Sequence, residues 1–209
     1  MKFKLEKDDD SFWMSIGDLM SGLLMLFVLI TLFALYKIHD SGKVQADIFS
    51  ELEKVSKQNK FNLKINEKNG TIEIADEILF ERNKSELKYE GKLFLDRFIP
   101  KLSEVVFKNS ESSNEIISID IEGHTSELST NPIFQKTMMI LSLARSQSVW
   151  VYIHEKFRSQ QNSKKLINKL KVCGWGNTKA SKYYDIQSDR KVVFQMHFRG
   201  LLEKLRGSE

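Results

Sequence analysis

The sequence contains very little cysteine. Its 209 residues include only Cys173, which excludes a disulfide within the chain. Free cysteine is among the most buried residue types in proteins. We therefore expect Cys173 to be buried and inert, with a disulfide between two chains as the alternative.

The sequence also lacks the motifs of catalysis and of metal binding. It has no P-loop, no zinc motif and no nucleophile arrangement, and its four histidines show no metal-ligand spacing. We therefore expect no enzyme, no catalytic residues, no metal site and no bound cofactor. His124 is expected to be a loop residue that forms hydrogen bonds.

Long basic runs are absent as well. The formal net charge is +4, to which the first ten residues contribute −1 and Asp18 another −1, so the part from Lys37 onward carries +6. A mildly basic domain is compatible with an anionic polymer but does not specify nucleic acid. We expect no nucleic-acid partner.

Charged residues are missing altogether from Leu19 to Tyr36. As a helix, the apolar segment 12–36 would measure roughly 37 Å, which is enough to cross a hydrocarbon core of about 30 Å. A cleaved signal peptide would have a shorter apolar run and a basic leader. The sequence therefore predicts one retained transmembrane helix over 12–36, after a leader over 1–11.

One acidic residue, Asp18, stands inside this segment. A carboxylate at membrane depth costs about 2.5 kcal/mol or more unless it faces a partner or water. Helical spacing places Asp18 on one face with Ser21 and Gly22, small residues that let helices approach closely. Intramembrane acids usually mark ion or proton routes, so Asp18 is a candidate ion-translocating residue. The alternative is a boundary charge at the level of the lipid headgroups.

The segment 37–60 is polar, with apolar residues at helical spacing. These residues are Val44, Ile48, Leu52 and Val55. The pattern predicts a short amphipathic helix. Three roles are open for it: a linker packed on the following domain, a helix that pairs with a second copy, or a plug that occludes a channel.

A domain is expected over 61–200, followed by a tail over 201–209. Alternating apolar residues predict a hairpin from 61–67 and 71–76, and further strands at 115–122, 171–175 and 191–198. Helical periodicity predicts helices over 85–107, 138–157 and 164–170. This order of elements predicts an α+β fold, with a mixed β-sheet backed by helices.

Four segments of the domain carry a family resemblance. They read ILFERNKSELKYEGKLFLDRF, IDIEGHTSE, LSLARSQSV and GWGNTKASKYYDIQSDRKVVF. In this order they resemble the motifs of the OmpA-like peptidoglycan-binding domain, and the match covers 61–198. The resemblance implies an OmpA-like fold, with peptidoglycan as a partner.

The apolar segment carries a second resemblance. SIGDLMSGLLMLFVLI resembles the aspartate-bearing helix of MotB, the stator subunit of ion motors, with Asp18 at the ion-carrying position. Anchor and domain together have the MotB layout. This short version is most similar to the ZorB family, the MotB-like subunits of the Zorya anti-phage defence systems.

The second resemblance implies an assembly and a location. The assembly is a homodimer inside a ring of MotA-like (ZorA-like) membrane subunits, with H⁺ or Na⁺ as the translocated ion. The chain would cross the bacterial inner membrane once, with its N-terminus in the cytoplasm and its domain in the periplasm. Equal numbers of lysines lie shortly before and shortly after the apolar segment, so the distribution of positive charge does not decide the orientation.

OmpA-like domains grip the diaminopimelate of the peptide stem with an aspartate after G-H-T and the arginine of L-S-x-x-R-A. Arg145 matches that arginine, with a structural salt bridge as the alternative role, whereas Ser126 and then Glu127 follow the G-H-T motif. The missing aspartate puts diaminopimelate recognition in question. The candidate peptidoglycan-binding residues are His124, Thr125, Ser126, Glu127, Leu141 and Arg145.

Several functions therefore stay open for the chain. The first is an ion-driven motor subunit with a cell-wall anchor, of the anti-phage type or of the flagellar stator type. The second is a passive envelope tether that needs no ion coupling. The third is a cell-wall enzyme or its accessory, which would need a catalytic pair that the sequence does not contain.

Overall fold

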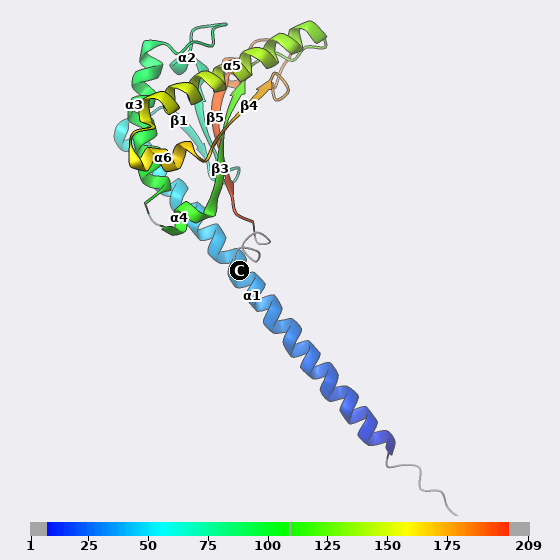
Figure 1. The fold of residues 1–209 in the computed structure, drawn as a ribbon. Coiled ribbons are helices and arrows are strands. Elements are labelled where there is room, and N and C mark those ends of the chain that lie inside the picture. The colour runs from blue at the N-terminus through cyan, green and yellow to red at the C-terminus, as the bar shows by residue number, and fades with distance from the viewer. Residues whose placement is uncertain (1–7, 109, 201–209) are drawn as a thin grey trace, which may run out of the picture. The chain divides into compact units, whose positions relative to one another are not determined.

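The computed structural model describes residues 8–108 and 110–200. In chain order the elements are α1 (Asp8–Asn59), β1 (Leu63–Asn66), β2 (Thr71–Ala75), α2 (Asp76–Leu79), α3 (Tyr89–Val106), α4 (Ser110–Glu115), β3 (Ile116–His124), α5 (Pro132–Phe157), α6 (Gln161–Ile167), β4 (Leu170–Gly176), η1 (Gln187–Asp189) and β5 (Lys191–Phe198) (Figure 1). The chain divides between Lys43 and Val44 into two compact units, which are described in turn.

The first unit contains the N-terminal part of α1. Residues 12–36 are long and apolar enough to cross a membrane, with a mean hydropathy of 2.4, and no part of the most apolar stretch is buried within the chain. The predicted leader over 1–11 and tail over 201–209 lie largely outside this description, because 1–7 and 201–209 are not among the described residues.

The second unit begins within the segment predicted as a linker. From Val44 to Asn59 this segment is helical, and Ile48, Phe49 and Leu52 are buried in the core of the unit. The ring centroids of Phe49 and Phe198 lie 6.0 Å apart. The apolar stripe of this segment therefore packs on the domain itself.

The domain is built on a five-stranded mixed sheet with the strand order β1-β2-β5-β3-β4. β3 and β4 are parallel, whereas the other neighbouring strands are antiparallel. The predicted hairpin forms between β1 and β2, and Gly70 takes the left-handed φ of +70° that its turn requires. This arrangement confirms the expected α+β class with a mixed sheet.

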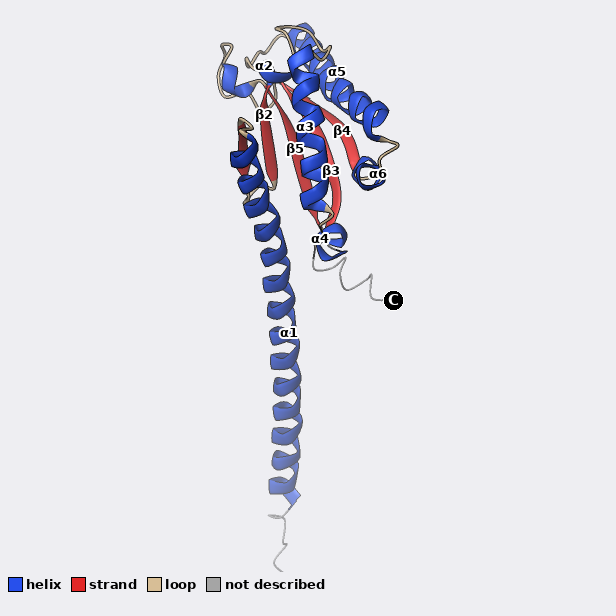
Figure 2. Ribbon diagram, turned by 90° about the vertical axis from the view of Figure 1, so that its left-hand side faces the viewer, coloured by secondary structure: helices blue, strands red, loops and turns tan. Residues whose placement is uncertain are grey.

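Helices cover one face of the sheet, and Figure 2 shows α3 lying against it. Residues that alternate along the strands point into this layer, among them Ile72, Ile121 and Phe194, each fully buried. Phe61, Phe94, Phe98 and Phe194 form an aromatic cluster with ring centroids 5.5–5.9 Å apart. The core therefore lies between the sheet and α1, α3 and α5.

α5 lies unusually close to β3 and β4. A Cβ atom on Gly123 would come within 2.0 Å of the Ser142 carbonyl oxygen, so only glycine fits there. The Ser142 hydroxyl accepts a hydrogen bond from the Gly176 N–H at 2.8 Å, and the Ser146 hydroxyl donates to the Cys173 carbonyl at 2.9 Å. These contacts fix the height of α5 above the parallel strands.

The structure differs from the sequence predictions in several element bounds, in some short helices and in the burial of Cys173. The helix predicted over 138–157 begins at Pro132, because the Asn131 side chain accepts hydrogen bonds from the first-turn N–H groups and proline suits the first helical position. The short helices α2 and α4 were not predicted. Cys173 is only half-buried, since its side chain lies on the sheet face opposite the helices.

Candidate functional site

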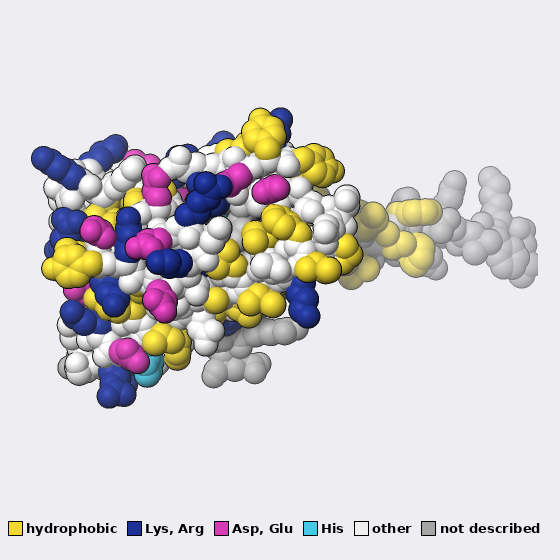
Figure 3. Space-filling model, turned by 90° about the horizontal axis from the view of Figure 1, so that it is seen from above, with side chains coloured by type: hydrophobic (Ala, Val, Ile, Leu, Met, Phe, Trp, Pro, Cys, Tyr) yellow, Lys and Arg dark blue, Asp and Glu magenta, His cyan; other side chains and the backbone are white. Residues whose placement is uncertain are grey.

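A cavity of about 470 Å³ opens at the end of the domain where three loops meet α5. The loops are those between α2 and α3, between β3 and α5, and between β4 and β5. The lining residues are Arg82, Asn83, Thr125, Ser126, Glu127, Phe134, Thr137, Met138, Leu141, Arg145, Asp185 and Arg190. Figure 3 views the molecule from above and shows acidic, basic and hydrophobic side chains interspersed over the visible face.

Five of the six candidate peptidoglycan-binding residues line this cavity. Arg145 and Leu141 come from α5, whereas Thr125, Ser126 and Glu127 come from the loop that precedes it. The sequence places these two groups far apart, and the crossing of α5 over the end of β3 brings them together.

Arg145 is the largest polar side chain in the core, with only 2% of its surface exposed. Its Nη2 lies 3.1 Å from Asp76 Oδ2, its Nε donates to the Lys84 carbonyl at 2.9 Å, and its guanidinium lies over the Phe80 ring. Among the described residues, Nη1 has no hydrogen-bond partner. The salt bridge expected as the alternative role is therefore present, and the two N–H donors of Nη1 are left without a partner among the described residues.

Burial dominates the electrostatics of this pair. Burial raises the pKa of Asp76 to about 6, although the charges of Arg145 and Arg190 act in the opposite direction. Burial likewise lowers the pKa of the Arg145 guanidinium, against the stabilising charge of Asp76. For both members of the pair, burial therefore changes the pKa more than the charge of the partner does.

Thr125 provides a second unused polar atom in the cavity. Its side chain is 3% exposed, and its hydroxyl has no hydrogen-bond partner within the described part of the chain. Its backbone N–H donates to the Gly176 carbonyl at 2.8 Å, which fixes its position. A buried polar group without a partner costs free energy, so Thr125 and Arg145 together favour a polar, oxygen-bearing ligand.

Ser126, which stands where OmpA-like domains have an aspartate, contacts a carboxylate from another loop. Its hydroxyl donates to Asp185 Oδ1. Asp185 also accepts hydrogen bonds from Arg82 and Arg190. The hydrogen bond from Ser126 is the largest of the effects that lower the pKa of Asp185, and burial opposes it.

Three charged residues that line the cavity were not predicted from the sequence: Arg82, Asp185 and Arg190. Asp185 and Arg190 belong to the segment YYDIQSDRKVVF, whose resemblance indicated only the fold. Periodicity cannot locate them, because the β4–β5 loop reaches the cavity without regular secondary structure apart from η1.

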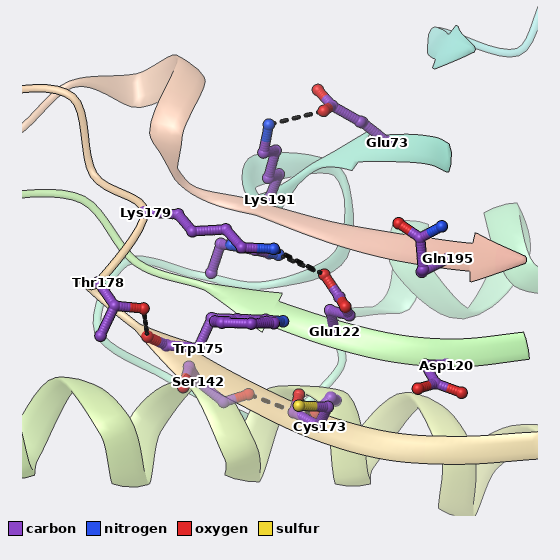
Figure 4. A network of polar contacts seen from close by, with 12 residues as sticks. Glu73, Asp120, Glu122, Ser142, Cys173, Trp175, Thr178, Lys179, Lys191 and Gln195 are labelled. Carbon is purple, nitrogen blue, oxygen red and sulfur yellow. Dashed lines mark hydrogen bonds and ion pairs between the residues drawn. The ribbon is translucent and has the colours of Figure 1, made fainter. Parts of the chain in front are cut away.

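His124 is the one candidate that does not line the cavity. Its Nε2 lies 3.1 Å from Glu122 Oε2, and its ring stacks on Trp175. Figure 4 shows the neighbouring network, in which Lys179 reaches Glu122 and lies over the Trp175 ring. This network lies on the sheet face opposite the helices, and its charges are paired with one another.

Asp18 belongs to the first unit and is exposed within the single chain. Next to it, the Ser21 hydroxyl donates to the Gly17 carbonyl at 2.8 Å, so this hydroxyl is satisfied within its own helix. Asp18 is thus the acidic group within the membrane-length segment 12–36.

The raised pKa of Asp76 predicts a pH dependence of stability. Asp76 binds a proton more tightly in the folded chain than in the unfolded chain. Its contribution to the free energy of unfolding is therefore present in full below about pH 4 and lost as the pH rises through about 6. When the pH is lowered from 7.5 to 4, the free energy of unfolding of wild type should rise by on the order of 2–3 kcal/mol relative to that of Asp76→Asn. Denaturant unfolding followed by tryptophan fluorescence measures this difference, and a constant difference would contradict the prediction.

Comparisons with known proteins follow the two-part layout of the chain. No family model matches it. It is 26% identical to the Zorya protein ZorB of Escherichia coli strain Crooks, over 91% of this chain and 90% of that protein.

Among solved structures, a MotB-like protein from Desulfovibrio vulgaris superposes with a TM-score of 0.55 at 18% identity, covering 78% of this chain and 96% of that one. The periplasmic domain of Helicobacter pylori MotB gives 0.47 at 16% identity, covering 69% and 87%. The chain therefore resembles ZorB along nearly its whole length, and its domain has the fold of the MotB-like protein.

Proposed function

We propose that this chain is the cell-wall-anchoring subunit of an ion-driven membrane motor that acts in anti-phage defence. The observation that carries the proposal is the similarity to ZorB, because it extends over both the membrane-length helix and the domain. In this proposal the domain binds peptidoglycan in the periplasm. The helix over 12–36 crosses the inner membrane once, with the N-terminus in the cytoplasm.

The cavity supports the anchoring part of the proposal. Arg145 Nη1 and Thr125 Oγ1 are buried, lack partners among the described residues and line the same space. A carboxylate of a peptide stem accepts hydrogen bonds from both groups, and a charged partner makes the hydrogen bond to arginine a strong one. Peptidoglycan stem peptides carry such carboxylates.

Asp18 supports the motor part of the proposal. We infer that Asp18 on each of two parallel helices takes up and releases H⁺, or coordinates Na⁺, as ions cross the membrane. In its neutral state the helix face can pass partner helices, whereas in its charged state it needs water or a polar partner. This alternation would turn a surrounding ring of MotA-like (ZorA-like) subunits about the anchored dimer.

Small residues near Asp18 support close helix packing. Gly17 and Gly22 have no atoms of the chain near the positions of an added Cβ, so another helix can approach them. In the proposed assembly that helix belongs to a second copy or to the ring. The competing function is a passive envelope tether, in which Asp18 is a boundary charge.

Thr125→Val tests the anchoring site without removing a charge. The change deletes a buried hydroxyl that has no partner among the described residues, so the free energy of unfolding should stay the same or rise. Binding to purified peptidoglycan should nevertheless weaken about three- to tenfold, the equivalent of one hydrogen bond. The measurement is sedimentation of the full chain with sacculi, beside a thermal melt.

The matched control for that test is Thr178→Val, since Thr178 is exposed and lies outside the cavity. Its hydroxyl donates only to the Trp175 carbonyl, so sedimentation should not change. Equal sedimentation of wild type and Thr125→Val would place the peptidoglycan site elsewhere. Wild type that does not sediment with sacculi would rule out wall binding.

Asp18→Asn tests ion coupling. The change keeps the size of the side chain and removes its titration, so it should abolish phage protection while the partner subunit is still recovered in a pull-down. Asp18→Glu keeps a carboxylate and should retain some protection. If Asp18→Asn protects cells as well as wild type does, Asp18 is not an ion carrier and the passive tether replaces the motor.

A further inference from the structure

We propose that Asn177 positions the loop 125–127 of the cavity for wall binding, because it holds Glu127 in a left-handed backbone conformation. The inference rests on the proposed wall-binding function and deepens it. Asn177 lies outside the cavity lining, whereas all three residues of the loop line the cavity. Asn177 is therefore a positioning residue, which acts on a ligand through the loop.

The segment 176–182, at the end of β4, holds the cavity loop by hydrogen bonds at three points. The backbone N–H groups of Thr125 and Leu128 each donate to a backbone carbonyl of this segment, at 2.8 Å and 2.7 Å. Between them, the side-chain amide of Asn177 donates to the Glu127 carbonyl at 2.7 Å. The first two hydrogen bonds join backbone groups, so a change of side chain leaves them in place. The hydrogen bond from Asn177 is the one that a substitution removes.

Glu127 needs such a hydrogen bond, because its backbone conformation is unfavourable. Its φ is +74°, in the left-handed region that costs free energy for residues other than glycine. Within the described part of the chain, the residues other than glycine with a positive φ are Lys60, Asn83 and Glu127, and the last two line the cavity. Backbone strain of this kind gathers at ligand sites, where the surrounding contacts maintain it.

Asn177 is itself held firmly, so it can hold the loop. Only 5% of its surface is exposed, and a buried amide needs a hydrogen-bond partner. The residue before it, Gly176, donates its backbone N–H to the Ser142 hydroxyl of α5 at 2.8 Å. α5 forms another wall of the cavity. The contact of Asn177 with Glu127 therefore fixes the position of the loop relative to α5.

The conformation of Glu127 affects where the preceding side chains lie. The Thr125 hydroxyl is buried and has no hydrogen-bond partner among the residues that the structure describes, and Thr125 stands only two residues before Glu127. A change of φ at Glu127 redirects the chain there, so the loop moves relative to Arg145 on α5. Groups that bind a ligand need to be held within about 0.5 Å of their working positions. Loss of the hydrogen bond from Asn177 should therefore weaken binding to the wall.

Two competing interpretations are that Asn177 only stabilises the fold, or that it acts by orienting the carboxylate of Glu127. Substitutions at Glu127 separate all three. Glu127→Gly removes the strain, since glycine takes a positive φ about as readily as a negative one. Glu127→Gln removes the carboxylate and keeps the strain. Asn177 should therefore matter for wall binding in the Glu127→Gln background and hardly at all in the Glu127→Gly background.

The experiment measures the affinity of the full chain for purified sacculi by sedimentation, with and without Asn177→Ala, in three backgrounds. In wild type and in Glu127→Gln, Asn177→Ala should weaken binding about fivefold, the equivalent of one hydrogen bond. In Glu127→Gly the same change should weaken binding less than about twofold. Each comparison joins two proteins that differ only at position 177, so a direct contribution of the Glu127 carboxylate to binding cancels.

A thermal melt of each sample shows whether the variants fold. Asn177→Leu keeps nearly the size of asparagine without a donor, so it carries the same prediction if Asn177→Ala gives no folded protein. The inference is overturned if Asn177→Ala binds sacculi as tightly as wild type, if its effect is equal in all three backgrounds, or if its effect also disappears in Glu127→Gln. Failure of wild type to sediment with sacculi would instead overturn the proposed wall binding.

Discussion

The buried contact between Asp76 and Arg145 is the interaction on which the cavity depends. It joins α5 to the start of α2 and holds a guanidinium that is only 2% exposed. Replacing a buried ion pair with apolar side chains often leaves a protein equally stable or more stable. Stability alone therefore gives a weak reason for burying Arg145. A ligand that pairs with Nη1 gives a stronger one, because it would satisfy a donor that lacks a partner among the described residues.

At the C-terminal end of β3 and β4, the domain treats its polar groups differently on the two faces of the sheet. On the uncovered face of the sheet, the charge of Glu122 is paired with His124 and Lys179, and Trp175 Nε1 is the buried atom that has no hydrogen-bond partner among the described residues of that network. In the cavity, Arg145 Nη1 and Thr125 Oγ1 lack hydrogen-bond partners within the part of the chain that the structure describes. Of the two faces, the cavity is the one where a charged group, Arg145, has a nitrogen that a ligand could pair with.

The fold was largely predictable, because the spacing of apolar residues along the sequence indicates which positions of a strand or helix are buried. The alternation of Ile117, Ile119 and Ile121 predicted a strand, and the turn at Lys68–Gly70 predicted the hairpin, both of which form. α2 was not predictable, since four residues show no helical period. Cys173 was expected to be buried and is half-buried, because residue preference does not say which face of a strand a side chain takes.

The candidate site was predictable only in part. Arg145 and the loop Thr125–Glu127 were identified by resemblance, but their approach depends on how closely α5 packs on Gly123. Asp76 and Asp185 could not be found, since each reaches the site through tertiary contacts from a distant segment. His124 was grouped with the site because it is adjacent in sequence. The alternation of a strand instead turns its side chain to the opposite face.

Arg145 is the residue that we propose to bind a peptidoglycan stem in this cavity. The most direct measurement is the NMR spectrum of the arginine side chains in the full chain, labelled with ¹⁵N-arginine, with and without purified soluble muropeptides. Arg145→Lys would assign the signal. Our account predicts that the guanidinium signals of Arg145 shift and exchange more slowly with water when muropeptide is added. Unchanged Arg145 signals in a sample that binds muropeptide would contradict the account.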